Sequence, residues 1–229
     1  LARWTHPERG PVPPEEFVAV AEQNGLVLAL GAHVLRTACA DLAGVRTPVG
    51  LPVTLGVNVS GRELNDPGYA QRVQDVLAET GFPARHLVLE VTESLLEGGS
   101  SAAVATLQAL RTAGLRVSID DFGTGWSSLS RLDTLPADVL KLDHSFIATV
   151  HCSPRRAQML QSLVAMCRGL GLDVVAEGVE TADQEAAVRA MGCTFAQGWR
   201  YGRPVPLPEL LAGLSAGREA LLLDAAYRG

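Results

Sequence analysis

The sequence predicts an α/β fold that is built on a parallel sheet and contained in one domain. Short runs rich in β-branched residues alternate with longer segments of helical period, which is the pattern of repeated βα units. Several runs are almost continuously apolar, as expected when helices cover both faces of a parallel sheet. With 229 residues, of which 47% are hydrophobic, the chain can bury one large core. Right-handed crossovers then lead either to an open doubly wound sheet or to a closed barrel.

Six strands are predicted in order along the chain. They cover residues 53–59, 87–92, 115–120, 139–143, 173–177 and 194–198. Helical period and glycine stop signals predict helices over residues 67–79, 101–113, 154–170 and 181–191, and two more helices over 14–23 and 29–42 precede the first strand. No repeat or low-complexity linker divides the chain, so we expect a single domain over residues 1–229.

Charge and composition exclude several classes of function. A net charge of -6 and a pI near 5.4 argue against a sequence-independent grip on duplex nucleic acid, which requires a basic surface. The four cysteines stand far apart without a C-x-x-C pair, which predicts reduced thiols in a cytosolic protein and no zinc or dithiol site. The longest apolar stretches, such as residues 26–32, are too short to span a bilayer, so we expect no membrane contact from this segment.

Each predicted strand ends in, or just before, a polar or charged residue. These residues are Asn58, Glu90, Asp120 with Asp121, Lys141, Glu177 and Gln197. In a parallel barrel all of them converge on the carboxyl-terminal face, where such barrels carry their active sites. Carboxylates gathered there repel one another unless cations compensate them, and ligands that are all oxygen favour Mg²⁺ or Mn²⁺ over zinc. Two such ions would polarise a phosphodiester and activate a water, which Lys141 would stabilise or orient.

Other interpretations of these residues stay open from the pattern alone. A single acidic residue at a strand end is often a helix cap or a salt-bridge partner. Lys141 and Asp143 flank Leu142 on a period-two run, so the two side chains could simply pair with each other. Trp126 and Trp199 lie beside site segments, where they could stack a base or fill the core. The loop that begins at Asp121 lacks the third glycine of a dinucleotide-binding fingerprint, and the other kinase motifs do not accompany its Asp-Phe-Gly string.

A set of ordered motifs extends over almost the whole chain. They are Arg3-Trp4-Thr5-His6-Pro7, Val57-Asn58-Val59-Ser60, Leu89-Glu90-Val91-Thr92-Glu93, Asp120-Asp121-Phe122-Gly123-Thr124-Gly125, Leu140-Lys141-Leu142-Asp143, Ala176-Glu177-Gly178-Val179-Glu180, Gln197-Gly198-Trp199 and Gly202-Arg203-Pro204. In order and spacing they resemble the EAL domain family of cyclic di-GMP phosphodiesterases. The resemblance implies a TIM-like (β/α)8 barrel with one antiparallel strand, and hydrolysis of cyclic di-GMP to linear pGpG.

Roles for single residues also follow from the resemblance. It implies that Asn58, Glu90, Asp120, Asp121 and Glu177 bind a pair of Mg²⁺ or Mn²⁺ ions. It further implies that Lys141 contacts the attacking water, that Gln197 supports the site, and that Glu93 steadies the loop over residues 122–128. Arg3 matches a residue that contacts a ligand phosphate, a role that suits a guanidinium. Asp143 and Glu180 are also expected to contact the substrate.

One departure from the family concerns the start of the chain. The Glu-Ala-Leu tripeptide that names the family leads into Arg3-Trp4, and only Leu1 could remain of it here. We therefore expect the domain to be truncated at its N-terminus, without the first barrel strand and its metal-binding glutamate. The resemblance also implies a homodimer formed near residues 121–128, an upstream GGDEF or sensor domain, and a cytoplasmic location, including the cytoplasmic part of a membrane-anchored protein.

Two rival functions are considered beside the phosphodiesterase. The first is a cyclic di-GMP receptor or regulatory module that binds without hydrolysis, for which the absent glutamate is the only support. A glutamate just upstream of Leu1 would favour the enzyme. The second is an unrelated barrel enzyme that acts on a sugar phosphate, and it lacks any matching motif.

Overall fold

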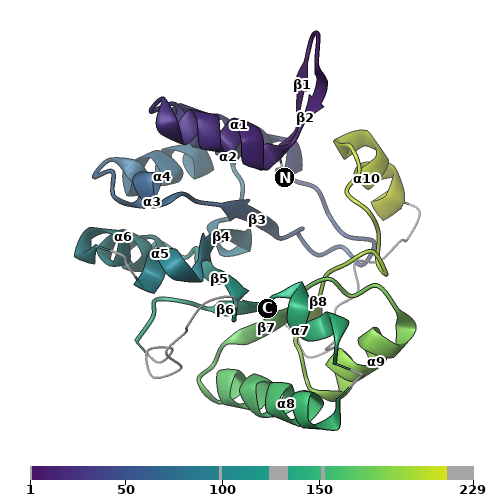
Figure 1. The fold of residues 1–229 in the computed structure, drawn as a ribbon. Helices are drawn as coiled ribbons and strands as arrows, with labels where there is room; N and C mark the ends of the chain where they lie inside the picture. The colour runs from purple at the N-terminus through teal and green to yellow at the C-terminus, as the bar shows by residue number, and fades with distance from the viewer. Residues whose placement is uncertain (1, 98–99, 124–133, 151–152, 216–229) are drawn as a thin grey trace.

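The computed structural model of the chain describes residues 2–97, 100–123, 134–150 and 153–215. Its centre is a parallel sheet with the strand order β3-β4-β5-β6-β7-β8 (Figure 1). The strands are β3 (Leu55–Asn58), β4 (Leu87–Thr92), β5 (Arg116–Phe122), β6 (Val139–Leu142), β7 (Asp173–Ala176) and β8 (Phe195–Ala196). All six predicted strands are confirmed. β3 and β8 are each three residues shorter than predicted, and β6 and β7 each end one residue earlier.

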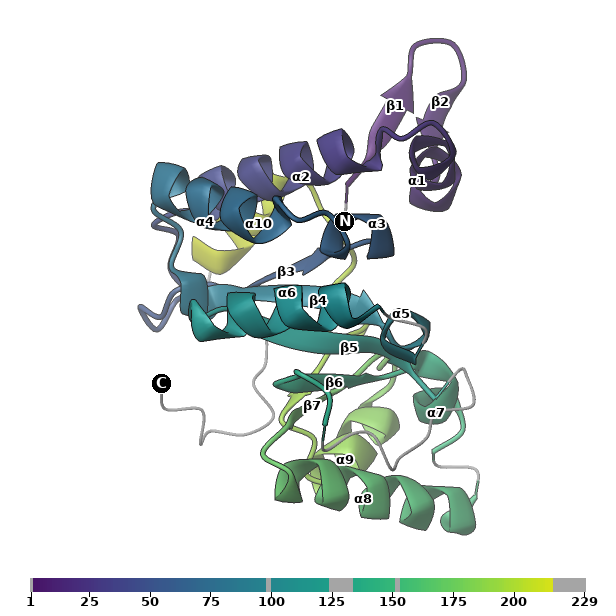
Figure 2. The same cartoon turned by 90° about the vertical axis from the view of Figure 1, so that its left-hand side faces the viewer.

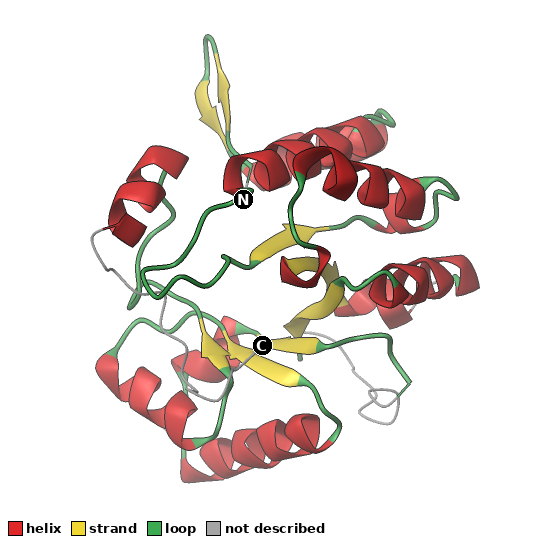
Figure 3. Ribbon diagram, turned by 180° about the vertical axis from the view of Figure 1, so that it is seen from behind, coloured by secondary structure: helices red, strands yellow, loops and turns green. Residues whose placement is uncertain are grey.

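The sheet curls, and its helices lie on the outer side (Figures 2 and 3). Six helices match the predicted ones: α1 (Pro14–Gln23), α2 (Val27–Leu42), α4 (Tyr69–Thr80), α6 (Ser101–Thr112), α8 (Pro154–Gly169) and α9 (Ala182–Ala190). The elements that were not predicted are α3 (Gly61–Leu64), α5 (Glu93–Glu97), α7 (His144–Ala148), α10 (Leu207–Ser215) and the short 3-10 helix η1 (Ala84–His86). Most of these are a single turn, which is too short for a helical period to show in a sequence.

The predicted barrel class is confirmed in the form of a half-barrel. In the part of the chain that the structure describes, β3 and β8 form the two edges of the sheet, and every pairing within it is parallel. The antiparallel strand that the resemblance implies is not a member of this described sheet. That strand and the single-domain boundary at residues 1–229 therefore stay predictions.

A small antiparallel hairpin stands apart from the main sheet. It consists of β1 (Trp4–His6) and β2 (Gly10–Val12) and projects from the body beside α1 (Figure 1). The Trp4 ring makes edge contacts with His6 and with Phe17 of α1, at centroid distances of 5.6 and 6.1 Å. Strands of three residues carry too little alternation to be read from the sequence, so this hairpin was not predicted.

The core lies between the outer face of the sheet and the helices. Along β4, Leu87 and Leu89 are fully buried, and Leu107 and Leu110 of α6 belong to the same buried cluster. Because side chains alternate along a strand, Glu90 points to the opposite face, toward the inside of the curled sheet. Alternation along β4 therefore places Leu87 and Leu89 in the core and Glu90 inside the half-barrel.

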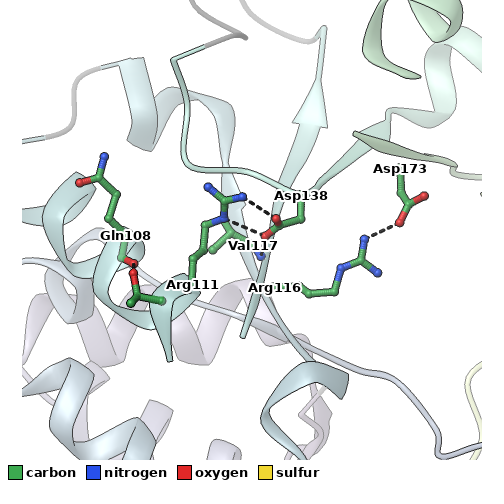
Figure 4. Close-up of polar contacts among 7 residues, drawn as sticks. Gln108, Arg111, Arg116, Val117, Asp138 and Asp173 are labelled. Atoms are coloured by element: carbon green, nitrogen blue, oxygen red, sulfur yellow. Dashed lines mark hydrogen bonds and ion pairs between the residues drawn. The ribbon is translucent and has the colours of Figure 1, made fainter. Parts of the chain in front are cut away.

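Ion pairs connect the elements around the amino-terminal ends of β5, β6 and β7 (Figure 4). Arg111 of α6 donates two hydrogen bonds to the Asp138 carboxylate, at 2.6 and 3.0 Å, and Asp138 also accepts the backbone N–H of Val117 at 2.9 Å. Arg116, the first residue of β5, pairs with Asp173, the first residue of β7. These contacts fix the starts of the strands at the end that faces away from the predicted site.

We expect Asp138→Ala to lower the free energy of unfolding by about 1–2 kcal/mol, because it leaves the partly buried N–H of Val117 without an acceptor and removes the bidentate partner of Arg111. Urea denaturation measures this change. Glu79→Ala is the matched control, since Glu79 pairs with Arg36 only at the surface, with both side chains more than half exposed. Its loss should stay below about 0.5 kcal/mol. Equal losses in the two variants would contradict a special role for Asp138.

Candidate metal centre

Lys141 lies at the centre of a group of three carboxylates. Its Nζ atom is 2.8 Å from Glu177 Oε1, 2.9 Å from Asp120 Oδ1 and 3.3 Å from Glu90 Oε1. Lys141 is 6% exposed, and it is the only lysine in a sequence that otherwise uses arginine for its basic side chains. A compact ammonium with three donors fits between converging carboxylates, whereas a planar guanidinium has a fixed fork.

Strand order explains why these four residues meet. Glu90 lies on β4, Asp120 on β5, Lys141 on β6, and Glu177 directly follows β7. These are neighbouring strands of one parallel sheet, so side chains near their carboxyl ends lie side by side. The backbone N–H of Glu177 continues the pairing by donating to the Leu142 carbonyl oxygen at 3.1 Å. The predicted convergence on this end of the sheet is confirmed for all four.

Burial and charge set the protonation of the group. Burial alone would lower the pKa of Lys141, but Glu90, Glu177 and Asp120 outweigh it and raise the pKa well above its usual range. For Glu90 and Glu177, loss of solvation is the largest effect and raises both pKa values, although Lys141 opposes the change. Three partly buried carboxylates around one ammonium leave an excess of negative charge, which a cation would neutralise.

Asp121 joins the group through an irregular turn of the backbone. The pairing of β5 with β6 shifts between Ile119 and Phe122, so one strand carries an extra residue there. Asp121 has φ +54°, the only positive φ of a non-glycine residue in the described part of the chain. This left-handed conformation costs about 1 kcal/mol and is tolerated best by Asp, Asn and Gly. Burial, followed by the charge of Asp120, raises the pKa of Asp121.

Three acidic side chains come close enough to share one ion. Asp120, Asp121 and Glu177 each offer a carboxylate oxygen, and these oxygens lie within 4.8 Å of one another. All the donors are hard oxygen ligands, and no described histidine or cysteine joins this group. Such a donor set fits a hard divalent cation better than a soft one.

Glu93 and Asp143 hold the backbone beside the group. Glu93 is 7% exposed, begins α5 and accepts the N–H of Gly123 through Oε2 at 3.1 Å. The Asp143 carboxylate caps α7 by accepting the N–H of Ser145, and its other oxygen lies 2.9 Å from His144 Nδ1. Lys141 therefore pairs with the other carboxylates and not with Asp143, so the simpler pairing considered from the sequence is wrong. The cap on α7 is the helix-cap alternative that was considered for acidic residues at strand ends, and Asp is among the residues preferred at that position.

The remaining predicted residues are exposed. Asn58 ends β3 in register with Glu90, and Gln197 follows β8. Glu180 and Arg3 are exposed as well, and Arg3 donates to the Ala2 carbonyl oxygen at 3.0 Å. The roles assigned to these four side chains stay predictions. Trp199 is 57% exposed with the Arg203 guanidinium 4.2 Å from its ring centroid, whereas Trp126 and most of the loop over residues 122–128 lie outside the described residues.

Comparison with known proteins gives consistent matches over nearly the whole chain. The model of the EAL domain family matches residues 1–204. The chain is 42% identical over 217 residues to an uncharacterized signaling protein of Caulobacter vibrioides, covering 95% of this chain and 26% of that protein. It is 40% identical over 218 residues to the cyclic di-GMP phosphodiesterase NbdA of Pseudomonas aeruginosa, covering 95% of this chain and 28% of NbdA.

Solved structures give the same result. The phosphodiesterase MucR of Pseudomonas aeruginosa, in complex with c-di-GMP, superimposes with a TM-score of 0.81 at 37% identity, over 91% of this chain and 84% of that one. The chain spans only about a quarter of the length of the curated relatives reported above. None of the helices formed by the described residues has the length and apolar character of a membrane span.

We expect Lys141→Met to destabilise the protein more at pH 8 than at pH 5. Without the ammonium the pKa values of Glu90 and Glu177 rise further above those in the unfolded chain, so the folded state gains protons as the pH falls and the penalty is relieved. Removing one partner from a buried ion pair should cost about 3–5 kcal/mol at pH 8. Urea denaturation at the two pH values measures the difference.

Lys141→Arg is the control for Lys141→Met, because it keeps the positive charge and changes only the shape of the side chain. Its loss of stability should depend much less on pH. An equal loss for Lys141→Met at pH 5 and pH 8 would show that the ammonium does not compensate the carboxylates.

Proposed function

The chain belongs to the EAL domain family, and on that premise we propose that it is a metal-dependent phosphodiesterase that hydrolyses cyclic di-GMP to linear pGpG. The observation that carries the proposal is the group formed by Lys141 with Glu90, Asp120 and Glu177 at the carboxyl ends of a parallel sheet. The 40% identity with a relative named as a cyclic di-GMP phosphodiesterase supports the choice of substrate. The relatives are several times longer, so the activity of the whole protein is part of the proposal.

The acidic residues would hold the metal ions. Asp120, Asp121 and Glu177 already bring their oxygens together, and Glu90 is kept beside them by Lys141. Asn58, in register with Glu90, would add an amide oxygen. We propose Mg²⁺ or Mn²⁺, two ions in all, because every donor in this set is an oxygen. When bound, such ions supply a Lewis acid and lower the pKa of water.

Lys141 would act on the attacking water. Its ammonium stays charged at neutral pH because the three carboxylates raise its pKa. It has three N–H donors, and cations that bind the carboxylates would compete for the oxygens that those donors now contact. A freed N–H would donate to the water and orient it toward the phosphorus.

The other residues would position the substrate and the loop. Arg3 would contact a phosphate of cyclic di-GMP through its guanidinium, and Asp143 and Glu180 would also contact the substrate. Gln197 would support the site after β8. Glu93 would keep the segment at Gly123 in place through the hydrogen bond to its N–H.

The group of carboxylates around Lys141 favours hydrolysis over a receptor that only binds the dinucleotide. A receptor needs no excess of buried negative charge, because a cyclic dinucleotide is itself an anion and such charge would repel it. Bound cations would neutralise the excess negative charge of the carboxylates around Lys141. The same cations would supply the chemistry for hydrolysis.

Assembly and location form the outer part of the proposal. We propose a homodimer formed near residues 121–128, and an upstream GGDEF or sensor domain in the parent protein. One relative, MucR of Pseudomonas aeruginosa, is named as a bifunctional diguanylate cyclase and phosphodiesterase, which supports a cyclase neighbour. We also propose that the domain works in the cytoplasm, either free or as part of a membrane-anchored protein.

We expect Glu90→Gln and Asp120→Asn each to lower the rate of cyclic di-GMP hydrolysis by more than about 100-fold, because each removes a charged ligand from the metal group. Incubation with cyclic di-GMP and Mn²⁺, followed by chromatography for pGpG, measures the rate. Asp75→Asn serves as the control, since Asp75 is an exposed carboxylate on α4. Circular dichroism should show the same fold in all variants. Wild-type activity in either site variant would remove that residue from the proposed machinery.

We expect the affinity for Mn²⁺ to fall as the pH is lowered, and the fall to begin above the ordinary glutamate pKa of 4.5. The reason is that burial raises the pKa values of Glu90 and Glu177, and that of Asp121 above its own ordinary value, so protons compete with the metal at a higher pH. Calorimetric titration with Mn²⁺ at a series of pH values measures the change. An affinity that stays constant down to pH 4.5 would contradict the raised pKa values.

A further inference from the structure

We propose that Phe146 is a positioning residue for the acidic group formed by Asp120, Asp121 and Glu177. It acts on Asp121 through Gly123. This inference rests on the proposed function only in so far as that function needs a metal ion bound at Asp121. The role depends on a contact between two elements that lie far apart in the sequence, α7 and the end of β5.

The contact itself is close and leaves no room for a side chain. A β-carbon added to Gly123 would lie 2.1 Å from Cε2 and 2.3 Å from Cζ of Phe146. The edge of the ring therefore occupies the place where a side chain at position 123 would project. Gly123 has φ +96°, a conformation that suits glycine and few other residues. Both the shape and the conformation of this position require glycine.

Phe146 is itself held firmly in place. Its ring packs against the main hydrophobic core, and its backbone N–H donates to the Asp143 carbonyl oxygen at 3.0 Å. The Asp143 side chain caps the same turn of α7, which begins two residues after the end of β6. The ring is thus attached to β6, the strand that carries Lys141.

Gly123 is held from both of its neighbouring strands. On one side Glu93, directly after β4, accepts its N–H, and on the other side the Phe146 ring from the end of β6 lies against its α-carbon. Asp121, two residues earlier, has the strained left-handed backbone and the carboxylate that meets Asp120 and Glu177. A strained residue keeps its conformation only where its surroundings enforce it. The backbone N–H of Asp121 donates to Asp120 Oδ1 at 3.1 Å, and the two contacts at Gly123 hold the backbone two residues further on.

The two contacts of Gly123 therefore restrain the backbone in different ways. The hydrogen bond from Gly123 to Glu93 fixes where the backbone lies along the sheet edge. The Phe146 ring prevents the backbone from swinging toward α7. If the ring is shortened, the segment can relax to an ordinary conformation, and the Asp121 carboxylate then leaves the group that it forms with Asp120 and Glu177.

The test is the affinity of the full chain for Mn²⁺, measured by calorimetry and by the electron paramagnetic resonance signal of free Mn²⁺. We expect Phe146→Leu to weaken binding by about 10- to 100-fold, the range seen when groups that orient metal ligands are removed. Phe17→Leu is the matched control, because Phe17 is also a partly buried phenylalanine on a helix, but it packs on Trp4 of the hairpin. Its Mn²⁺ affinity should equal that of the wild type.

A second variant separates positioning from general loss of structure. Gly123→Ala forces a β-carbon against the ring and should weaken Mn²⁺ binding as well, and the double variant should weaken it by much less than the product of the two single effects. Thermal unfolding without metal shows that each variant is folded.

Wild-type Mn²⁺ affinity in a folded Phe146→Leu variant would overturn the inference while leaving the phosphodiesterase proposal intact. If the wild-type chain binds Mn²⁺ but does not hydrolyse cyclic di-GMP, the proposed function fails and the role of Phe146 stands. A wild-type chain that binds no Mn²⁺ would overturn both.

Discussion

The ion cluster around Lys141 is the interaction on which the site depends. One ammonium is shared by carboxylates from β4, β5 and the end of β7, and it keeps three acidic side chains together that would otherwise repel one another. The cluster is partly buried, so removal of the ammonium would leave carboxylates whose charge neither water nor salt can fully compensate. It is also incomplete, because one positive charge faces more than one negative charge. The excess negative charge of this group would attract a further cation.

The two ends of the sheet differ in charge balance and in the regularity of the backbone. At the amino ends of the strands, Arg111 pairs with Asp138 and Arg116 pairs with Asp173, so that each positive charge is balanced by a negative one. The second pair reaches from β5 across β6 to β7. At the carboxyl ends the charge is unbalanced and the backbone is irregular. Stability and chemistry are thereby separated along the strands, which is the usual arrangement in parallel α/β barrels.

Strain is concentrated beside the acidic group formed by Asp120, Asp121 and Glu177. Asp121 is the residue with the unfavourable backbone, and the extra residue in β5 directs two consecutive aspartates toward one site. In a regular strand, neighbouring side chains point to opposite faces, so Asp120 and Asp121 could not both contribute. The bulge solves this geometric problem, and the contacts of Gly123 with Glu93 and Phe146 hold the result in place.

The sequence by itself determined the class of fold, six strands, six helices and the polar residues that meet at the carboxyl ends of the strands. Each of these leaves a local signature, such as alternation, helical period or a polar residue where an apolar run ends. Only the tertiary structure decided that Lys141 pairs with Glu90, Asp120 and Glu177 and not with Asp143, and that Asp121 takes a left-handed conformation. The hairpin formed by β1 and β2 and the contact of Phe146 with Gly123 also became visible only there. These features depend on which strands are neighbours and on how they are aligned, and a periodicity measured along one segment contains no information about its partners.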